Sequence, residues 1–191
     1  MSPTKIMVIR HAEKPVPDGA PGIAPDGSPN PKSLSQAGWD RARMLVSFFS
    51  QPTASAIDKP DALFAAAPDQ GSQRPYETVL LLARALWPEP EQSQRFNAAI
   101  VKEDVQGLAA AVMAASGVVL VSWEHKLIPA AVSALPNAPA TPTKWPSDRF
   151  DVVWILTARQ DSWDFEQTPQ RLMESDQDSV IPFSHLAADG P

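Results

Sequence analysis

Near its amino terminus the chain reads Lys5-Ile6-Met7-Val8-Ile9-Arg10-His11-Ala12-Glu13-Lys14, an apolar run that ends abruptly in an Arg-His pair. The run is typical of a short buried strand, since it is continuously apolar. Arg and His directly after it are groups suited to gripping and attacking a phosphate. A lone His is also a common loop residue at a sheet edge, so the rest of the chain must decide between the two interpretations.

Strand-like and helix-like patterns alternate through the rest of the chain. Ser35 is a suitable helix cap, and apolar residues at three- and four-residue spacing follow it as far as Phe49. Pro75 fits the first turn of a helix that ends before Pro88, and Gly117 fits a helix stop. The predicted strands cover residues 5–9, 62–66, 118–121 and 150–156, and the predicted helices cover 35–49, 75–87, 104–116 and 127–135.

This alternation predicts an α/β fold, with a mainly parallel sheet and helices on both of its faces. The length of 191 residues suits a single domain over residues 1–191. Residues 15–31 hold six prolines and three glycines, which exclude a helix or a central strand. We expect an irregular flap beside the site there, rather than a disordered linker. Residues 158–191 turn polar and are expected to form a surface tail.

Composition narrows the classes of function. The net charge of −6 argues against general nucleic-acid binding, and any phosphate must be held by a local cationic pocket. The absence of Cys excludes disulfides, thiolate catalysis and cysteine-metal sites. The first apolar stretch is too short for a signal sequence or a membrane span, so we expect a cytoplasmic protein without membrane contact.

Cationic side chains follow three of the predicted strands. Arg10 and His11 follow the first strand, Arg74 follows the second at a helix start, and His125 follows the third. Carboxyl ends of parallel strands meet at one edge of a sheet, where ligands bind. The free N–H groups of a helix start also favour an anion. We therefore expect the two arginines and the two histidines to form one phosphate pocket.

Such a pocket predicts a specific chemistry. A neutral imidazole is a competent nucleophile toward phosphorus, and Arg groups bind phosphate oxygens in two-point fashion. Positioned donors supply the electrostatic stabilisation, so the site needs no metal and no cofactor is expected. A carboxylic acid would protonate the leaving oxygen and later activate water.

The sequence resembles the histidine phosphatase superfamily, the phosphoglycerate mutase-like group, over residues 5 to about 130. Four motifs carry the resemblance: Arg10-His11-Ala12-Glu13, Leu34-Ser35-Gln36-Ala37-Gly38 with Ala42, Arg74-Pro75-Tyr76-Glu77-Thr78, and Val119-Leu120-Val121-Ser122 leading to His125. The resemblance implies that His11 is the phosphorylated nucleophile and that Arg10, Arg74 and His125 bind the phosphate. It also implies a three-layer α/β/α sandwich.

The sequence departs from the family's pattern where a further donor and the acid are expected. Pro17 stands where many members have an Asn, and Lys126 stands where one branch has an Asp after the second His. No segment between residues 86 and 103 matches the usual acid-bearing one. Glu124 is the first candidate for the proton donor, unless strand alternation turns it away from the ligand. Glu103 is the second candidate.

Two further residues of the motifs have a simpler explanation. Glu13 is expected to orient its neighbours rather than donate a proton, and Ser72 to cap a helix rather than bind phosphate. The leading hypothesis is a metal-independent phosphatase that hydrolyses a phosphomonoester or phosphoramidate through phospho-His11. The alternatives are a phosphomutase and a non-catalytic phospho-ligand binder without an effective acid. The expected partner is a small phosphorylated substrate or a phosphoprotein, and the oligomeric state stays open.

Overall fold

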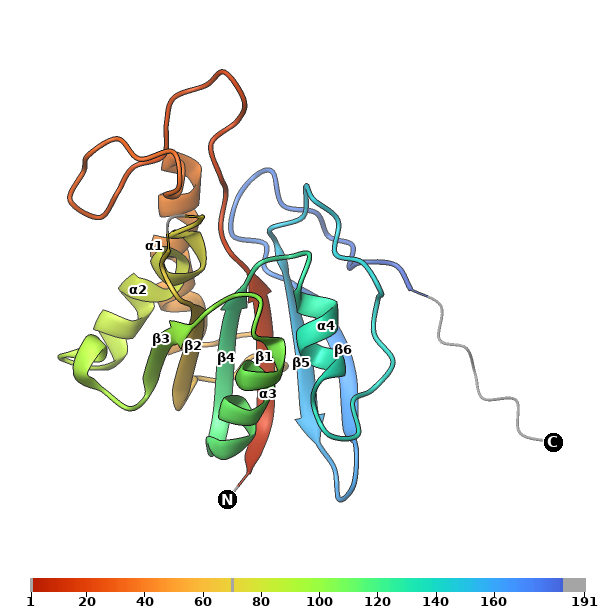
Figure 1. Ribbon diagram of the computed structural model, residues 1–191. Helices are drawn as coiled ribbons and strands as arrows, with labels where there is room; N and C mark the ends of the chain where they lie inside the picture. The colour runs from red at the N-terminus through yellow and green to blue at the C-terminus, as the bar shows by residue number, and fades with distance from the viewer. Residues whose placement is uncertain (1, 70, 184–191) are drawn as a thin grey trace.

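The computed structural model describes residues 2–69 and 71–183, and its strands form one six-stranded sheet in the order β3-β2-β4-β1-β5-β6 (Figure 1). Strands β1 to β4 pair in parallel with one another, whereas β5 pairs antiparallel with β1 and β6 pairs antiparallel with β5 at one side. The prediction of a mainly parallel sheet is therefore confirmed. The strands are β1 (Pro3–Arg10), β2 (Ala62–Ala66), β3 (Phe96–Ile100), β4 (Gly117–Trp123), β5 (Val152–Ala158) and β6 (Trp163–Pro169).

Helices cover both faces of the sheet and complete the three layers (Figure 1). On one face the cluster around Met7 and Ile9 includes Leu45 of α1 and Val79 of α2. On the other face a second cluster joins the opposite side of the sheet to α3 and α4. The predicted α/β/α sandwich is thus confirmed. The helices are α1 (Gln36–Ser50), α2 (Arg74–Leu86), the 3-10 turn η1 (Pro90–Gln92), α3 (Val105–Ala114) and α4 (Ile128–Ser133).

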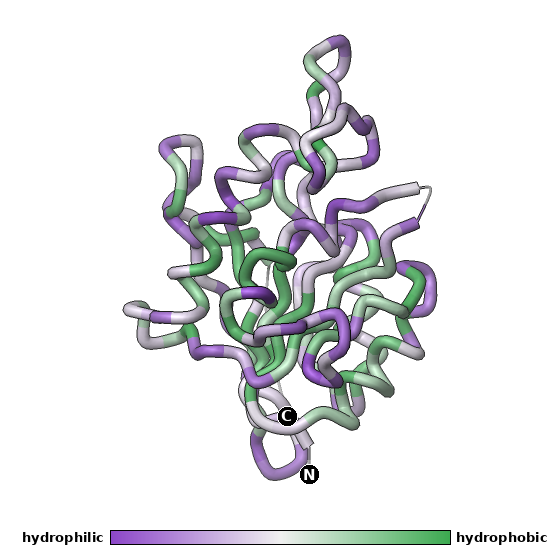
Figure 2. Tube along the Cα trace, turned by 90° about the vertical axis from the view of Figure 1, so that its left-hand side faces the viewer, coloured by the Kyte–Doolittle hydropathy of each residue, from purple (hydrophilic) through white to green (hydrophobic). Residues whose placement is uncertain are grey.

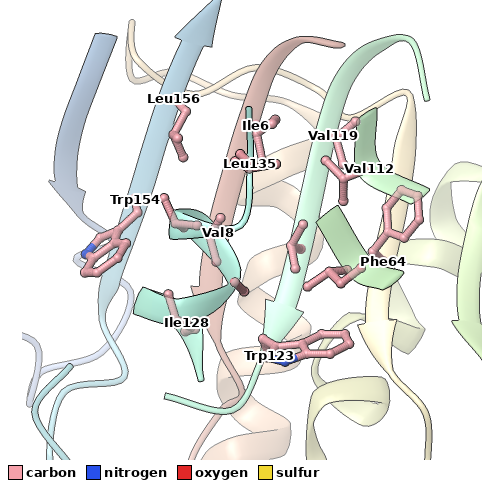
Figure 3. Packing of buried hydrophobic residues seen from close by; sticks show 14 of the residues in the cluster. Ile6, Val8, Phe64, Val112, Val119, Trp123, Ile128, Leu135, Trp154 and Leu156 are labelled. Carbon is pink, nitrogen blue, oxygen red and sulfur yellow. The ribbon is translucent and has the colours of Figure 1, made fainter. Parts of the chain in front are cut away.

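Strand β1 is buried on both faces because its side chains alternate between the two clusters. Ile6 and Val8 point to the α3 and α4 side, where they lie near Val112 and Ile128 (Figure 3). The intervening Met7 and Ile9 belong to the opposite cluster. In Figure 2 the strongly hydrophobic stretches run through the middle of the molecule, and outer loops are mostly hydrophilic. No helix among the described residues is long and apolar enough to cross a membrane.

Local signals fix the helix starts. The Ser35 hydroxyl accepts a hydrogen bond from the Gly38 amide at 3.1 Å, as expected of a cap. Pro75 lies in the first turn of α2, where its missing N–H costs nothing. The carboxylate of Asp104 caps α3 in the same way as Ser35 caps α1. Gly117 has a φ of 73°, a left-handed conformation that favours glycine at the first residue of β4.

Two strands were not predicted from the sequence. The surface tail expected from residue 158 is wrong for Trp163–Pro169, which pairs with β5 as the edge strand β6. This strand alternates a buried Trp163 with exposed polar residues, so its overall polarity conceals it. Strand β3, at the other edge, was also missed. His185 lies outside the described residues.

The Pro-rich segment of residues 15–31 contains no helix, as expected, and one isolated bridge joins Ile23 to Pro29. In Figure 1 it rises above the carboxyl end of β1 as two loops beside α1. The Trp39 indole donates a hydrogen bond to the Ile23 carbonyl at 2.7 Å and ties this flap to α1.

Candidate active site

All five predicted site residues line one pocket of about 300 Å³. The pocket lies at the carboxyl ends of β1 and β4 and beside the start of α2, because the parallel pairing of β1 with β4 sets Arg10 opposite Trp123. The amide of His11 donates to the Trp123 carbonyl at 3.0 Å and extends this pairing by one residue. The lining residues are Arg10, His11, Lys14, Gly71, Ser72, Arg74, Pro75, Lys102, Glu124, His125, Lys126 and Ser147.

Arg10 is buried and held from one side of its guanidinium. Its Nη1 atom donates to the carbonyls of Pro146, Ser147 and Arg149 at 3.3, 2.8 and 3.0 Å. The Nε and Nη2 atoms are buried and have no hydrogen-bond partner among the described residues. The guanidinium carbon also lies 3.8 Å from the centre of the Phe150 ring, a cation–π contact. Arg10 thus keeps two fixed donors for an anion.

Burial lowers the pKa of Arg10 to about 10, which leaves the group charged at neutral pH.

His11 is held in one tautomer. Its Nδ1 atom lies 2.7 Å from the carbonyl of Ala12, and a carbonyl only accepts, so Nδ1 carries the proton. The lone pair is therefore on Nε2. Burial, followed by the positive charges of Arg10 and Arg74, lowers the pKa of His11 to about 3. The imidazole is neutral at physiological pH and available as a nucleophile.

His125 lines the same pocket from the segment after β4. Burial and the nearby Arg10, Lys126 and Lys14 charges lower its pKa to about 4. Its Nδ1 atom is buried without a hydrogen-bond partner among residues 2–69 and 71–183. A dianion bound between these cations would favour protonation of this ring, which would then donate to it.

Arg74 links the pocket to the flap. Its Nη2 atom donates to the Pro31 carbonyl at 2.7 Å, and its Nε atom to the Ser33 carbonyl at 3.2 Å. Burial lowers the pKa of Arg74. The Ser72 hydroxyl accepts from the Arg74 amide at 3.3 Å and Ser72 lines the pocket, but the N-cap of α2 is Gln73, without a side-chain cap hydrogen bond, so the expected capping role of Ser72 is wrong.

Thr78 explains the last position of the Arg74–Thr78 motif. Its hydroxyl donates to the Arg74 carbonyl at 2.7 Å and accepts from the Ala12 amide at 2.8 Å. Thr78 is fully buried, and it therefore fixes the loop after His11 against the helix that presents Arg74.

The other motif carboxylates support loops. Both carboxylate oxygens of Glu13 accept hydrogen bonds from the Arg41 guanidinium. The same guanidinium donates to the carboxylate of Asp176 through Nη1 and Nη2, and to the side-chain oxygen of Gln170 through Nη1. The carboxylate of Glu77 is fully buried and accepts hydrogen bonds from the Ser33 hydroxyl at 2.7 Å and from the Leu34 amide at 2.8 Å. Burial raises the pKa of Glu77. Glu13 does not line the phosphate pocket, in keeping with an orienting role.

Within residues 2–69 and 71–183, Glu124 is the one acidic side chain that lines the pocket of Arg10 and His11. One of its oxygens lies 3.9 Å from the Lys102 Nζ atom. Glu103, the second candidate for the donor, lies outside the lining, and its side chain is 68% exposed. Glu124 therefore is the acid best placed to act on a bound ligand.

Three lysine side chains line the pocket although the sequence did not single them out as anion-binding residues. Lys102 follows β3, the strand that was missed, and Lys14 and Lys126 follow the Arg-His motif and the second His. Lys126 drew notice only as a departure from the family's pattern. With Arg10 and Arg74, these residues bring five Lys or Arg side chains to one pocket of a protein whose net charge is −6.

Pro17 lies outside this pocket. Among the described residues, no group of three or more His, Asp or Glu is arranged to hold a metal ion.

No protein-family model and no curated protein matches the sequence. The chain is similar to a proposed phosphohistidine phosphatase, SixA, from Agrobacterium tumefaciens, at 18% identity and a TM-score of 0.48, covering 86% of this chain and 95% of that one. It is similar to a proposed α-ribazole-5′-P phosphatase from Escherichia coli at 13% identity and a TM-score of 0.48, covering 85% and 95%. The product of open reading frame Rv3214 from Mycobacterium tuberculosis gives 14% identity and a TM-score of 0.41, covering 85% and 95%. These values are too low to assign a function, which must come from the residues of the site.

Proposed function

We propose that the protein is a phosphatase of the histidine phosphatase type, which hydrolyses a phosphomonoester through a phospho-His11 intermediate. The observation that carries the proposal is the tautomer of His11 in its setting. A neutral ring with its lone pair on Nε2 faces a pocket where Arg10 has two unpartnered donors. Nucleophile and phosphate-binding donors are the two parts that such a displacement requires.

In the first step, the His11 Nε2 lone pair forms a bond to phosphorus while the bond from phosphorus to the ester oxygen breaks. The alcohol oxygen takes a proton from Glu124, the acid that lines the pocket. In the second step, the Glu124 carboxylate takes a proton from water, whose oxygen attacks phosphorus. The N–P bond breaks, and phosphate and neutral His11 are released.

Charge on the transferring group is stabilised by groups that are already in position. Arg10 and Arg74 supply guanidinium donors, and the start of α2 beside Arg74 adds the positive end of a helix dipole. His125 becomes a further donor once a bound dianion has raised its pKa. These groups do not need to reorganise during the reaction, since Arg10 is held by three backbone carbonyls.

The test compares the wild type with His11→Ala and His11→Asn on p-nitrophenyl phosphate, phenyl phosphate and phosphoramidate, with a chelator present throughout. We expect hydrolysis by the wild type, no effect of the chelator, and loss of at least about 10³-fold in both variants. A brief reaction quenched in alkali should trap phosphate on the wild type alone, in a linkage that is stable to alkali and labile to acid.

Activity that survives in both His11 variants, or that disappears with the chelator, would overturn the proposal. Phosphate transfer to an added alcohol in preference to water would identify a mutase. Binding of inorganic phosphate without any turnover would identify a phospho-ligand binder.

A further inference from the structure

A second pocket, of about 500 Å³, opens beside the phosphate pocket and is not used by the chemistry above. It lies between the flap, the first turn of α1 and the segment before β5, and its volume is within the range of about 300–1,000 Å³ that holds small ligands. Its walls are mostly apolar and include three prolines. The apolar lining comprises mainly Pro15, Val16, Pro17, Pro21, Ile23 and Phe150.

The two pockets are adjacent and share part of their lining. Lys14 and Ser147 line both of them. Phe150 forms part of the apolar wall, and its ring centre lies 6.2 Å from that of His11 and 3.8 Å from the guanidinium carbon of Arg10. A group attached to a phosphate at Arg10 and His11 therefore has the apolar pocket beside it.

The flap that forms the outer wall is fixed in place by backbone hydrogen bonds. The Ile23 amide donates to the Leu34 carbonyl at 2.8 Å, and the Asn30 amide donates to the Gly22 carbonyl at 2.7 Å. A Cβ on Gly22 would lie 2.5 Å from the Asn30 and Ser33 carbonyl oxygens, so this close approach requires glycine. With its prolines, the flap is a preformed wall that loses little freedom when a ligand binds.

The charges around the apolar pocket set the class of its occupant. Its one carboxylate, Glu13, already binds Arg41 through both oxygens, and its one cation, Lys14, stands at the junction with the phosphate pocket. The other polar residues of its lining, Ser35, Gln36 and Ser147, are uncharged and offer no opposite charge to a second charged group. Val16 extends this apolar surface, with a side chain that is 69% exposed.

We infer that the apolar pocket binds the alcohol part of the substrate, so that the preferred substrate is the phosphomonoester of an uncharged, apolar alcohol with an aromatic or branched-alkyl body. The inference rests on the proposed phosphatase function. It separates such esters from phosphorylated sugars and acids, whose several polar or charged groups would lose water against walls that are mostly apolar.

The experiment compares α-naphthyl phosphate with phenyl phosphate, whose leaving groups are both phenols, and with glycerol phosphate. We expect the wild type to prefer the naphthyl ester over the phenyl ester by about 10-fold or more in kcat/KM. Two variants alter the pocket without touching the phosphate site: Val16→Gln makes its wall polar and Ala37→Phe fills it. Both should lower kcat/KM for the naphthyl ester about 10-fold and leave glycerol phosphate unchanged.

Met44→Gln is the matched control, because Met44 is also an exposed apolar residue, at 41%, and lies in neither pocket. It should leave all three substrates unchanged. Equal kcat/KM for naphthyl and phenyl esters, or variants that affect all substrates alike, would overturn the inference while the phosphatase function stands. Failure of the wild type to hydrolyse any of the three would instead reject the phosphatase function itself.

Discussion

The hydroxyl of Thr78 accepts a hydrogen bond from the amide of Ala12 at 2.8 Å, and so joins the loop that carries His11 to helix α2. The same hydroxyl donates to the carbonyl of Arg74 at 2.7 Å. One buried oxygen thus sets the distance between the proposed nucleophile and Arg74, a proposed phosphate ligand. Neither Thr78 nor Ala12 lines the pocket, yet the geometry of the pocket depends on both.

Replacement of Thr78 by Val keeps the shape and removes this link. The Ala12 amide loses its partner in a buried setting, so we expect a loss of about 1–3 kcal/mol in the free energy of unfolding. We also expect kcat/KM to fall about 10-fold or more, because the His11 loop shifts relative to Arg74. Urea denaturation and steady-state kinetics measure the two effects. Thr78→Ser retains the hydroxyl and should restore most of the activity; a serine variant as impaired as the valine variant would show that the methyl group, not the hydrogen bond, matters.

Substitution of Arg41 tests the buried ion pairs that hold Glu13 in place. Its ion pair with Asp176 has both side chains only 2% exposed. Arg41→Gln leaves buried carboxylates without their partner and should cost about 3–5 kcal/mol in the free energy of unfolding. The control is Arg43→Gln on the same helix, since the ion pair of Arg43 with Asp40 is exposed and should contribute at most about 1 kcal/mol. If the two variants lost similar amounts of the free energy of unfolding, the buried ion pairs of Arg41 would not stabilise the fold as stated.

The lowered histidine pKa values predict how stability depends on pH. His11 and His125 have pKa values of about 3 and about 4 in the folded protein, against 6.5 for an ordinary histidine. Below pH 6.5 the unfolded chain binds protons at these positions while the folded protein does not. Stability is therefore full above pH 6.5 and falls as the pH is lowered toward 4.

The contribution of the two histidines to the pH dependence of stability can be measured by comparison with a variant that lacks both. Between pH 6.5 and 5 the wild type should lose about 3 kcal/mol more than a His11→Asn/His125→Asn double variant, because each histidine contributes about 1.5 kcal/mol and contributions from carboxylates cancel. Urea denaturation at each pH measures the difference. Parallel curves for the two proteins would mean that neither histidine is held neutral.

Glu124→Gln tests the proposed acid. We expect phenyl phosphate, which has a poor leaving group, to lose about 10²-fold in kcat/KM, which reports the transfer to His11, whereas p-nitrophenyl phosphate should lose far less, since its leaving group needs little protonation. Glu103→Gln is the matched control: Glu103 also lies close to Lys102, at 3.7 Å, but outside the pocket. Equal effects of Glu124→Gln on both esters would remove Glu124 from this role.

The sequence was sufficient to predict the centre of the sheet. Strand β2 matches its predicted range of residues 62–66, and β1 and β4 extend theirs by a few residues at either end. These strands are buried on both faces, so their sequences are continuously apolar. The convergence of Arg10, Arg74 and His125 followed from the rule that parallel strands end at one edge.

The edges and loops of the molecule gave no comparable signal. Strand β3 has only one buried residue, Phe96, and without that strand nothing indicated that Lys102 would reach the pocket. Contacts such as those of Arg41 with Asp176 join residues that lie far apart in the chain, and a single sequence carries no pattern for them. The apolar pocket likewise depends on the path of a flap that has no periodicity.

Arg10, at the end of β1, donates its hydrogen bonds to the carbonyls of residues 146, 147 and 149, and Arg41, beside Glu13, donates to the side chains of Gln170 and Asp176. A chain still being synthesised has its proposed nucleophile exposed long before the ribosome has added these partners. The pocket is consequently among the last parts of the protein to reach its working geometry, and a product truncated before residue 146 would carry every recognisable motif and yet lack the contacts that hold its arginine in place.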